Sequence, residues 1–402
     1  MGCQKMNVAV FLKSDLHSGG GYQYESMVIN LINKFHKDKS IKFKYYGNSV
    51  NVIENHKNTP TPINLVQDNI FQKIHRHILG YSNGYKILKK INKEKSYIEK
   101  ILKNDEIDLV YFLSPNVLSL GLGDIPFIFT LWDLGHLDVP EFPEVSYNNT
   151  FEQKEFLYTR CLKKAYKVIV DSRYAKYNVI KRYNLAVKRI KVLKFLPNIS
   201  SFKEAPFINI KKKYNINNDY VFYPAQFWPH KNHIYILRAI KILKEEKGIN
   251  IDVIFCGSDK GNLEYILQKS QEYGIKNQVH YLGFVTNTEI PYLYKQCLSM
   301  VMPTYLGPTN IPPLEAFYYK VPVCYSDFPY FREQVKDAAF FINLKDPNNL
   351  VQSLIDIRDN NAVEEKILKG VDILGSWKDD DFYKGLMDLI YEYSYIRGCW
   401  GR

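Results

Sequence analysis

The stretch VFYPAQFWPHKNHIYILRAIKIL, residues 221–243, has the pattern of a strand, a loop and a helix in that order. Its first residues are apolar and β-prone, and residues 233–243 have the apolar periodicity of a helix. The loop places Lys231 close to a helix N-terminus, where free N–H groups favour anions. The stretch therefore predicts an anion-binding loop. Alternatively, residues 230–232 only cap the helix while Phe227 and Trp228 pack against it.

Similar apolar runs alternate with helical stretches along the whole chain, and this pattern predicts an α/β fold with parallel sheets covered on both faces. In the first half the runs are 7–13, 107–113, 126–132, 167–172 and 190–195. In the second half they are 220–225, 251–257, 278–284, 298–304, 321–326 and 338–342. A polar, proline-containing stretch that begins at residue 197 separates the halves and predicts a linker. Because ligands of such sheets bind at the carboxyl ends of the strands, we expect a site in a cleft between two domains.

The chain of 402 residues carries a net charge of +12, which favours anionic partners. The excess is concentrated in residues 71–103, with nine Lys or Arg and two Asp or Glu. This segment predicts either a surface helix with a solvated basic side or a helix on anionic lipid headgroups. No apolar run reaches the roughly 18 residues of a membrane span, so we expect a soluble, cytoplasmic protein that can lie peripherally at the inner face of the cytoplasmic membrane.

A second stretch, MPTYLGPTNIPPLEAFYYKVPVCYSD at residues 302–327, predicts a strand that ends at Thr304, a loop, and a helix that begins near residue 313. Glu315 would then fall in the first turn, where its carboxylate can accept hydrogen bonds from a ribose diol. The alternative is a charge that only complements the helix dipole. Loop amides could also surround a sugar or phosphate, and the candidates are Thr309, Asn310 and Ile311.

Two loops of the first half add candidates. In HSGGGYQYESMVINLI, residues 17–32, Gly20 and Gly21 allow the backbone to approach a ligand at a helix start, or they only form a tight turn. In TLWDLGHLDVPEFPEVS, residues 130–146, Asp133 and His136 are candidate catalytic residues. A histidine in such a place is otherwise typical of a structural hydrogen bond.

The two second-half stretches, in this order, resemble the nucleotide-binding half of the retaining glycosyltransferases of family 4, the group 1 glycosyltransferases. The wording QFWPHKNH and GPTNIPPLEA is similar to a subgroup that makes bacterial surface polysaccharides. By this resemblance Lys231 takes the pyrophosphate-binding position, Gln226 stands where many members have Arg, and Glu315 takes the second glutamate. Gly307 replaces the first glutamate, and Trp132 replaces a usual histidine.

The resemblance implies a GT-B fold of two Rossmann-like doubly wound domains that face each other across a cleft. The implied domains are residues 1–200, joined by a returning C-terminal helix at 377–402, and a donor domain at 201–376. No metal or other cofactor is implied, and no nucleic acid.

The implied reaction moves a sugar from a nucleotide-diphosphate sugar to a glycan or polyprenyl-linked glycan, with retention of configuration. O-antigen, capsule or related polysaccharide synthesis is the implied setting. Lys231, the Thr309–Ile311 amides and the glycine loop would stabilise the leaving diphosphate. His136 and Asp133 would act at the sugar or the acceptor.

Two other functions stay open from the sequence. A sugar-nucleotide 2-epimerase uses the same fold, but it needs a set of acid and base residues that these motifs do not supply. A non-enzymatic protein could use its basic charge to bind nucleic acid or a membrane, although the basic residues do not form a known recognition motif.

Overall fold

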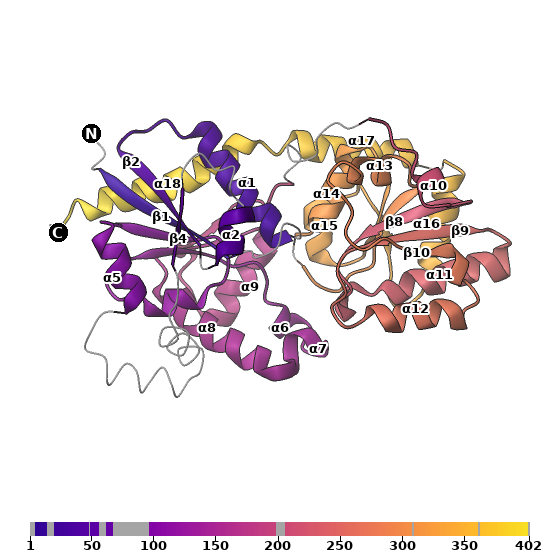
Figure 1. Cartoon of the computed structure of the whole chain (residues 1–402), viewed down its shortest axis with the longest axis horizontal. Coiled ribbons are helices and arrows are strands. Elements are labelled where there is room, and N and C mark those ends of the chain that lie inside the picture. Colours follow the sequence, from indigo (N-terminus) through magenta and orange to yellow (C-terminus); the bar gives the residue numbers. More distant parts are fainter. Residues whose placement is uncertain are drawn as a thin grey trace. The chain divides into compact units, whose positions relative to one another are not determined.

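The structure is a computed structural model that describes residues 5–13, 20–47, 49–55, 62–66, 96–197, 206–307, 309–360 and 362–400. The described residues form two compact units, each built on one parallel sheet (Figure 1). The first unit draws on Met1–His136, Tyr147–Leu196 and Lys378–Arg402. The second draws on Leu137–Ser146 and Pro197–Trp377.

The sheet of the first unit has seven strands in the order β3-β2-β1-β4-β5-β6-β7, and every neighbouring pair is parallel. Every residue of β4, β5 and β6 is buried, as expected for a sheet with both faces covered. The strands are β1 Met6–Leu12, β2 Ile41–Gly47, β3 Ile63–Leu65, β4 Leu109–Phe112, β5 Phe127–Thr130, β6 Lys167–Val170 and β7 Ile190–Val192.

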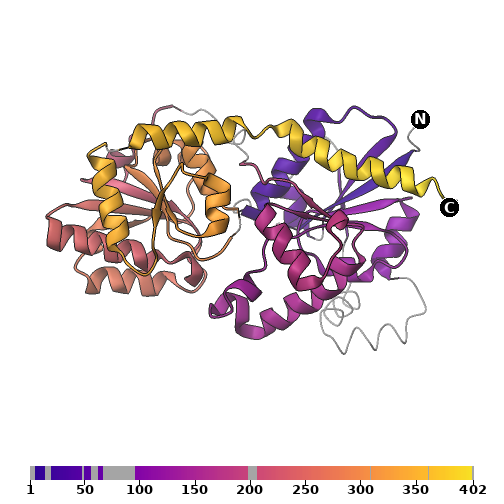
Figure 2. The same cartoon turned by 180° about the vertical axis from the view of Figure 1, so that it is seen from behind.

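Helices from both ends of the chain cover this first sheet. They are α1 Gly20–Phe35, α2 Val50–Asn55, α5 Tyr97–Asn104, α8 Thr150–Lys164, α9 Arg173–Tyr183 and α18 Asp379–Arg397. Figure 2 shows the yellow helix α18 lying along the first unit. The Tyr393 hydroxyl donates to the Asp108 carbonyl at 3.2 Å, and Arg397 pairs with the Asp108 carboxylate at 2.8 Å. The C-terminal helix therefore belongs to the first unit.

The second unit repeats this architecture with six parallel strands in the order β10-β9-β8-β11-β12-β13. The strands are β8 Asp219–Pro224, β9 Ile251–Cys256, β10 Val279–Tyr281, β11 Ser299–Met302, β12 Val323–Ser326 and β13 Phe340–Ile342. The helices are α10 Ile210–Lys213, α11 His233–Lys247, α12 Leu263–Glu272, α13 Ile290–Lys295, α14 Ile311–Tyr318, α15 Pro329–Val335, α16 Asn348–Arg358 and α17 Val363–Gly375.

Strand order reverses between β1 and β4 in the first sheet, and between β8 and β11 in the second. In open α/β sheets, ligands bind beside such a reversal, outside the carboxyl ends of the strands. The loops that follow β8 and β11 are the two stretches singled out in the sequence. The fold thus brings both predicted donor motifs to one edge of the second sheet.

One segment of the second unit comes from the first half of the chain. The sequence assigns residues 137–146 to the first domain, but the structure groups Leu137–Ser146, with the short helix α7 Pro143–Ser146, with the second unit. Val139 and Val145 are buried against Leu306, which lies after β11. Contacts between apolar side chains, and not order along the chain, decide where this segment packs.

Part of the basic segment 71–103 lies outside the described residues, because only residues 96–103 are described and most of these form α5. None of the helices in the described ranges combines the length and apolar character needed to cross a membrane. Within the same ranges, no cluster of three or more His, Cys, Asp or Glu side chains is placed to hold a metal ion.

Candidate functional site

Lys231 lies in the loop that follows β8, and its side chain reaches Asn310 in the loop that follows β11. A short 3₁₀ turn, Pro229–Lys231, leads from the first loop into α11. The Lys231 Nζ atom donates to Asn310 Oδ1 at 3.2 Å, and its backbone carbonyl accepts from the Tyr223 hydroxyl at 2.9 Å. The side chain is only half-buried, so its ammonium group combines a fixed position with access from solvent.

Asn310 is itself held by a hydrogen-bond network inside the second unit. Its Nδ2 donates to the Gly307 carbonyl at 3.0 Å and to the Tyr325 hydroxyl at 2.8 Å. Its backbone N–H donates to Gln334 Oε1 at 3.3 Å, and Gln334 Nε2 donates back to its carbonyl at 2.6 Å. The structure therefore differs from the prediction that the Asn310 amide faces a ligand. Asn310 positions Lys231 instead.

The other two predicted backbone amides, of Thr309 and Ile311, have few further N–H groups beside them. Ile311 is the first residue of α14, and Thr309 precedes it in a half-buried bend. Because Pro312 and Pro313 have no N–H, the first turn of α14 offers fewer donors than an ordinary helix start. An anion at this edge consequently depends more on the Lys231 ammonium than on amide dipoles.

Gly307 occupies a position that a side chain would disturb. Its φ is +111°, a backbone conformation that strongly favours glycine. A Cβ atom added there would lie 2.8 Å from Asn310 Oδ1, the atom that accepts from Lys231. The glycine that replaces a family glutamate is thus required by the shape of this loop, and the loop has no room for a glutamate in its present conformation.

Glu315 differs from its predicted place. Helix α14 begins at Ile311, so Glu315 lies beyond the first turn and does not complement the helix N-terminus. Its side chain is buried, and its Oε2 accepts from the Tyr294 hydroxyl at 2.7 Å. Burial, together with the nearby Glu315 charge, raises the pKa of Tyr294 well above its usual value, which keeps this donor protonated. Tyr294 thus orients the carboxylate.

The aromatic residues of the β8 loop are structural. Phe227 is buried and stacks on the His233 ring, with centroids 4.2 Å apart. The Trp228 indole donates to Gln226 Oε1 at 3.0 Å. This hydrogen bond holds the side chain of Gln226, which the sequence predicts to bind the donor substrate. The backbone at Ala225 passes so close to Gly257 that a Cβ there would lie 2.6 Å from the Ala225 carbonyl oxygen. The packing alternative is therefore correct for Phe227.

The buried imidazole of His233 gives the second unit a pH-dependent stability. Burial lowers its pKa from 6.5 to about 3, so the folded protein holds it neutral. The unfolded chain takes up a proton as the pH falls through about 6.5, and we expect the free energy of unfolding to fall by about 2 kcal/mol between pH 7 and 5. Urea unfolding of the wild type and of His233→Phe at pH 7 and 5 measures this. A variant with the same pH dependence as the wild type would contradict it.

The carboxylate of Glu144 fastens the loop that carries Lys231. Its Oε1 accepts from the His230 backbone N–H at 2.9 Å and from His230 Nδ1 at 2.5 Å. Burial opposes ionisation of this largely buried side chain, but the two hydrogen bonds from His230 outweigh it and hold the pKa of Glu144 below its usual value. No local sequence pattern indicates this contact, because 86 positions separate the partners.

Glu144→Gln is expected to lower the free energy of unfolding by about 1–3 kcal/mol, because the two bonds to His230 lose their charged acceptor. Urea unfolding at neutral pH measures the difference. Glu141→Gln removes an exposed carboxylate from the same segment and serves as the matched control. Equal losses in the two variants would show that the Glu144–His230 contact adds no stability.

The first unit has its own pocket, of roughly 450 Å³, at the carboxyl ends of its strands. Trp132 and Asp133, which follow β5, line it together with Lys13, Asn116 and Lys154. Asp133 Oδ1 accepts from the Gly135 N–H at 2.8 Å and lies 3.8 Å from Lys154 Nζ. An aromatic ring among hydrogen-bonding side chains suits a polyhydroxylated ligand such as a sugar.

His136 and the glycines at the start of α1 differ in how tightly the first unit packs around them. The His136 side chain is fully buried and donates from Nε2 to Glu155 Oε1 at 2.8 Å, and burial lowers the pKa of His136. It is a core residue and is not among the residues that line the pocket. Gly20 and Gly21 begin α1, and a Cβ on Gly20 would contact nothing, so packing within the unit does not require that glycine.

The sequence is similar to those of known glycosyltransferases. The chain is 27% identical over 217 residues to the O-antigen chain mannosyltransferase RfbU of Salmonella typhimurium, which covers 52% of this chain and 57% of the relative. It is 26% identical over 223 residues to the O-antigen chain mannosyltransferase B of Escherichia coli, and the alignment covers 54% of this chain and 55% of that relative. The chain thus spans about half the length of these curated relatives.

Solved structures show the same fold at low sequence identity. Anabaena HepE in complex with UDP-glucose aligns over 96% of this chain and 100% of its own, with a TM-score of 0.72 and 16% identity. Sucrose-phosphate synthase from Thermosynechococcus elongatus aligns over 96% and 98%, with a TM-score of 0.71 and 14% identity. The fold is GT-B. Residues 206–369 match the family model "Glycosyl transferases group 1", and the chain accordingly carries a group 1 glycosyl transferase domain.

Proposed function

We propose that this protein transfers a sugar from a nucleotide-diphosphate sugar to a glycan or lipid-linked glycan acceptor, with retention at the anomeric carbon. The observation that carries the proposal is the Lys231 ammonium, held by Asn310 at the strand-order reversal of the group 1 domain. A fixed cation beside this reversal suits a diphosphate.

In the proposed reaction, the bond from the anomeric carbon to the diphosphate oxygen breaks, and negative charge builds on the leaving diphosphate. A preorganised cation stabilises this charge without rearranging, and Lys231 is that cation. The acceptor hydroxyl forms the new bond on the same face of the sugar and gives its proton to the leaving phosphate oxygen. No protein base is then required. The pocket of Trp132 and Asp133 would hold the acceptor.

The names of the relatives support a setting and a first donor to test. Both curated relatives described above are O-antigen chain mannosyltransferases, so we propose a role in bacterial surface-polysaccharide synthesis and a mannose-bearing donor. The same names favour transfer over the 2-epimerase that shares the fold. Incubation of the accepted donor without an acceptor separates the two, because only an epimerase would change the sugar.

A thermal-shift panel of UDP, GDP, dTDP, CMP and their sugars tests the proposal directly. A ligand that binds only the folded state raises the melting temperature by mass action. We expect one nucleoside diphosphate and its sugar to raise Tm, and the others to leave it unchanged. A panel without any shift at saturating concentrations would contradict nucleotide-sugar binding.

Glu315→Gln is expected to weaken binding of that nucleoside diphosphate by about fivefold to tenfold, because a ribose diol loses a charged acceptor. The glutamine can still accept from the Tyr294 hydroxyl, so the fold around it is preserved. Calorimetry measures both affinities. Equal affinity would show that Glu315 serves only as the buried partner of Tyr294.

We further propose a peripheral contact between residues 71–103 and an anionic membrane at its cytoplasmic face. The support is the local charge of nine basic against two acidic residues, and a lipid-linked acceptor would lie at such a surface. Vesicle sedimentation at low and high salt tests this contact, which must weaken as salt rises.

A further inference from the structure

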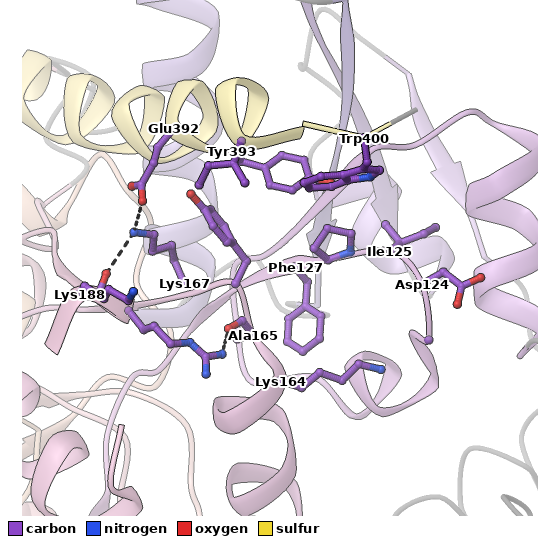
Figure 3. A pocket seen from close by; sticks show the side chains of 15 residues that line it. Asp124, Ile125, Phe127, Lys164, Ala165, Lys167, Lys188, Glu392, Tyr393 and Trp400 are labelled. Carbon is purple, nitrogen blue, oxygen red and sulfur yellow. Dashed lines mark hydrogen bonds and ion pairs between the residues drawn. The ribbon is translucent and has the colours of Figure 1, made fainter. Parts of the chain in front are cut away.

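A second pocket, of roughly 620 Å³, lies in the first unit at the edge opposite the proposed acceptor pocket. Residues that precede β5, β6 and β7 line it, and so does the end of the C-terminal helix α18. In a parallel sheet, strand starts and strand ends lie at opposite edges, so this pocket is separate from the site described above. Figure 3 shows Glu392, Tyr393 and Trp400 above the pocket, with Lys167 and Lys164 below.

Positive charge predominates among the lining side chains. Four of them are basic, Lys164, Lys167, Lys188 and Arg189, and two are acidic, Asp124 and Glu392.

The acidic side chains neutralise only part of this charge. Glu392 pairs with Lys167 at 2.8 Å, and Asp124 pairs with Lys103, which is not one of the lining residues. The Arg189 guanidinium donates to the backbone carbonyls of Lys163 and Ala165, which are neutral acceptors at the end of α8. Lys188 is exposed, and no described residue forms a hydrogen bond or ion pair with its ammonium group. The pocket consequently keeps an attraction for anions.

Large apolar side chains are exposed beside this charge. Tyr391, Tyr395, Ile396 and Trp400, which we call the C-terminal apolar row, come from the last turns of α18 and the residues that follow. Tyr395 is 74% exposed and Trp400 is 55% exposed, and Ile396 and Trp400 also line the pocket. Ile396 and Trp400 thus bring exposed apolar surface to the pocket itself, and Tyr391 and Tyr395 extend that surface along α18.

We propose that this pocket binds the phosphate of an anionic lipid headgroup, with the C-terminal apolar row lying in the membrane–water interface. Lysine and arginine side chains are attracted to anionic headgroups, and Trp and Tyr collect at the same depth of a bilayer. A small soluble phosphate ester would use the cations but would leave the outward-facing Tyr395 without a role. The lipid uses both features. This contact adjoins the one proposed for residues 71–103, because Lys103 pairs with the lining residue Asp124.

Sedimentation of the full-length protein with vesicles tests the proposal, comparing phosphatidylcholine alone with phosphatidylcholine mixed with phosphatidylglycerol. We expect Lys188→Glu to lower the partition coefficient on the mixed vesicles about fivefold or more, since each basic residue near such a surface contributes a factor of this order. Trp400→Ala should weaken binding as well. Lys247→Glu makes the same change in net charge on the exposed end of α11 and should change binding less than about twofold.

Two results would overturn the assignment. If Lys188→Glu and Trp400→Ala bind the mixed vesicles as the wild type does, the protein meets the membrane elsewhere. If pyrophosphate binds in calorimetry and loses affinity in Lys188→Glu while no vesicle binds, the pocket serves a soluble phosphate ester. Far-ultraviolet circular dichroism of each variant shows that the fold is intact, so that lost binding is not lost folding.

Discussion

Replacing Lys231 with alanine is expected to lower kcat/KM at least tenfold, a loss of about 1.4 kcal/mol or more of transition-state stabilisation. The Lys231 ammonium is held at Asn310 Oδ1, and negative charge develops on the diphosphate as the sugar leaves. Alanine removes the cation and leaves the backbone of the 3₁₀ turn intact. Initial rates with the donor identified by thermal shift measure the change.

Lys247→Ala is the matched control for this experiment. Lys247 is an exposed lysine in the last turn of α11, so its loss changes net charge by the same amount and should leave kcat/KM unchanged. Equal kinetics for Lys231→Ala and the wild type would remove Lys231 from the mechanism. Equal losses in both variants would mean that general electrostatic attraction, and not a placed cation, drives donor binding.

Gly307→Ala is expected to lower both activity and stability. A side chain at φ +111° costs about 1–3 kcal/mol in backbone strain. The new Cβ would also displace Asn310 Oδ1, and this group cannot move freely because Nδ2 is bonded to the Gly307 carbonyl and to Tyr325. We therefore expect kcat/KM to fall about tenfold, as Lys231 loses its anchor.

Gly274→Ala separates general backbone strain from this specific clash. Gly274 also has a positive φ, of +64°, but a Cβ there would meet nothing within 4 Å. We expect that variant to lose some stability and to keep its activity. If Gly307→Ala retained wild-type kcat/KM, the link from Gly307 through Asn310 to Lys231 would be wrong.

Most of the fold can be predicted from local sequence, because strands that are buried on both faces are continuous apolar runs, and these stand out from the polar segments between them. All six strands of the second unit, and five of the seven in the first, fall on such runs. The sequence does not indicate β2, because Lys42 and Lys44 interrupt its apolar pattern, or β3, which is only three residues long. Helix α14 begins two residues earlier than predicted, since two prolines fit in one first turn.

The site was only partly predictable. Lys231 and Gly307 carry local signals, a cation after a strand and a glycine in a turn. The Asn310–Gln334 and Glu144–His230 contacts carry none, because they join segments that only the folded sheet brings together. His136 shows the opposite case: its residue type and its place in the loop favour a catalytic role, but its side chain is buried in the core. Burial and pairing decide such roles, and neither is visible in a motif.

The most direct measurement is a crystal structure with the nucleoside diphosphate that the thermal-shift panel selects. We expect its phosphates at hydrogen-bond distance from Lys231 Nζ, beside the loops that follow β8 and β11. A nucleotide bound elsewhere, or a Lys231 side chain directed away from the phosphates, would contradict the proposed role of this lysine and with it the proposed donor site.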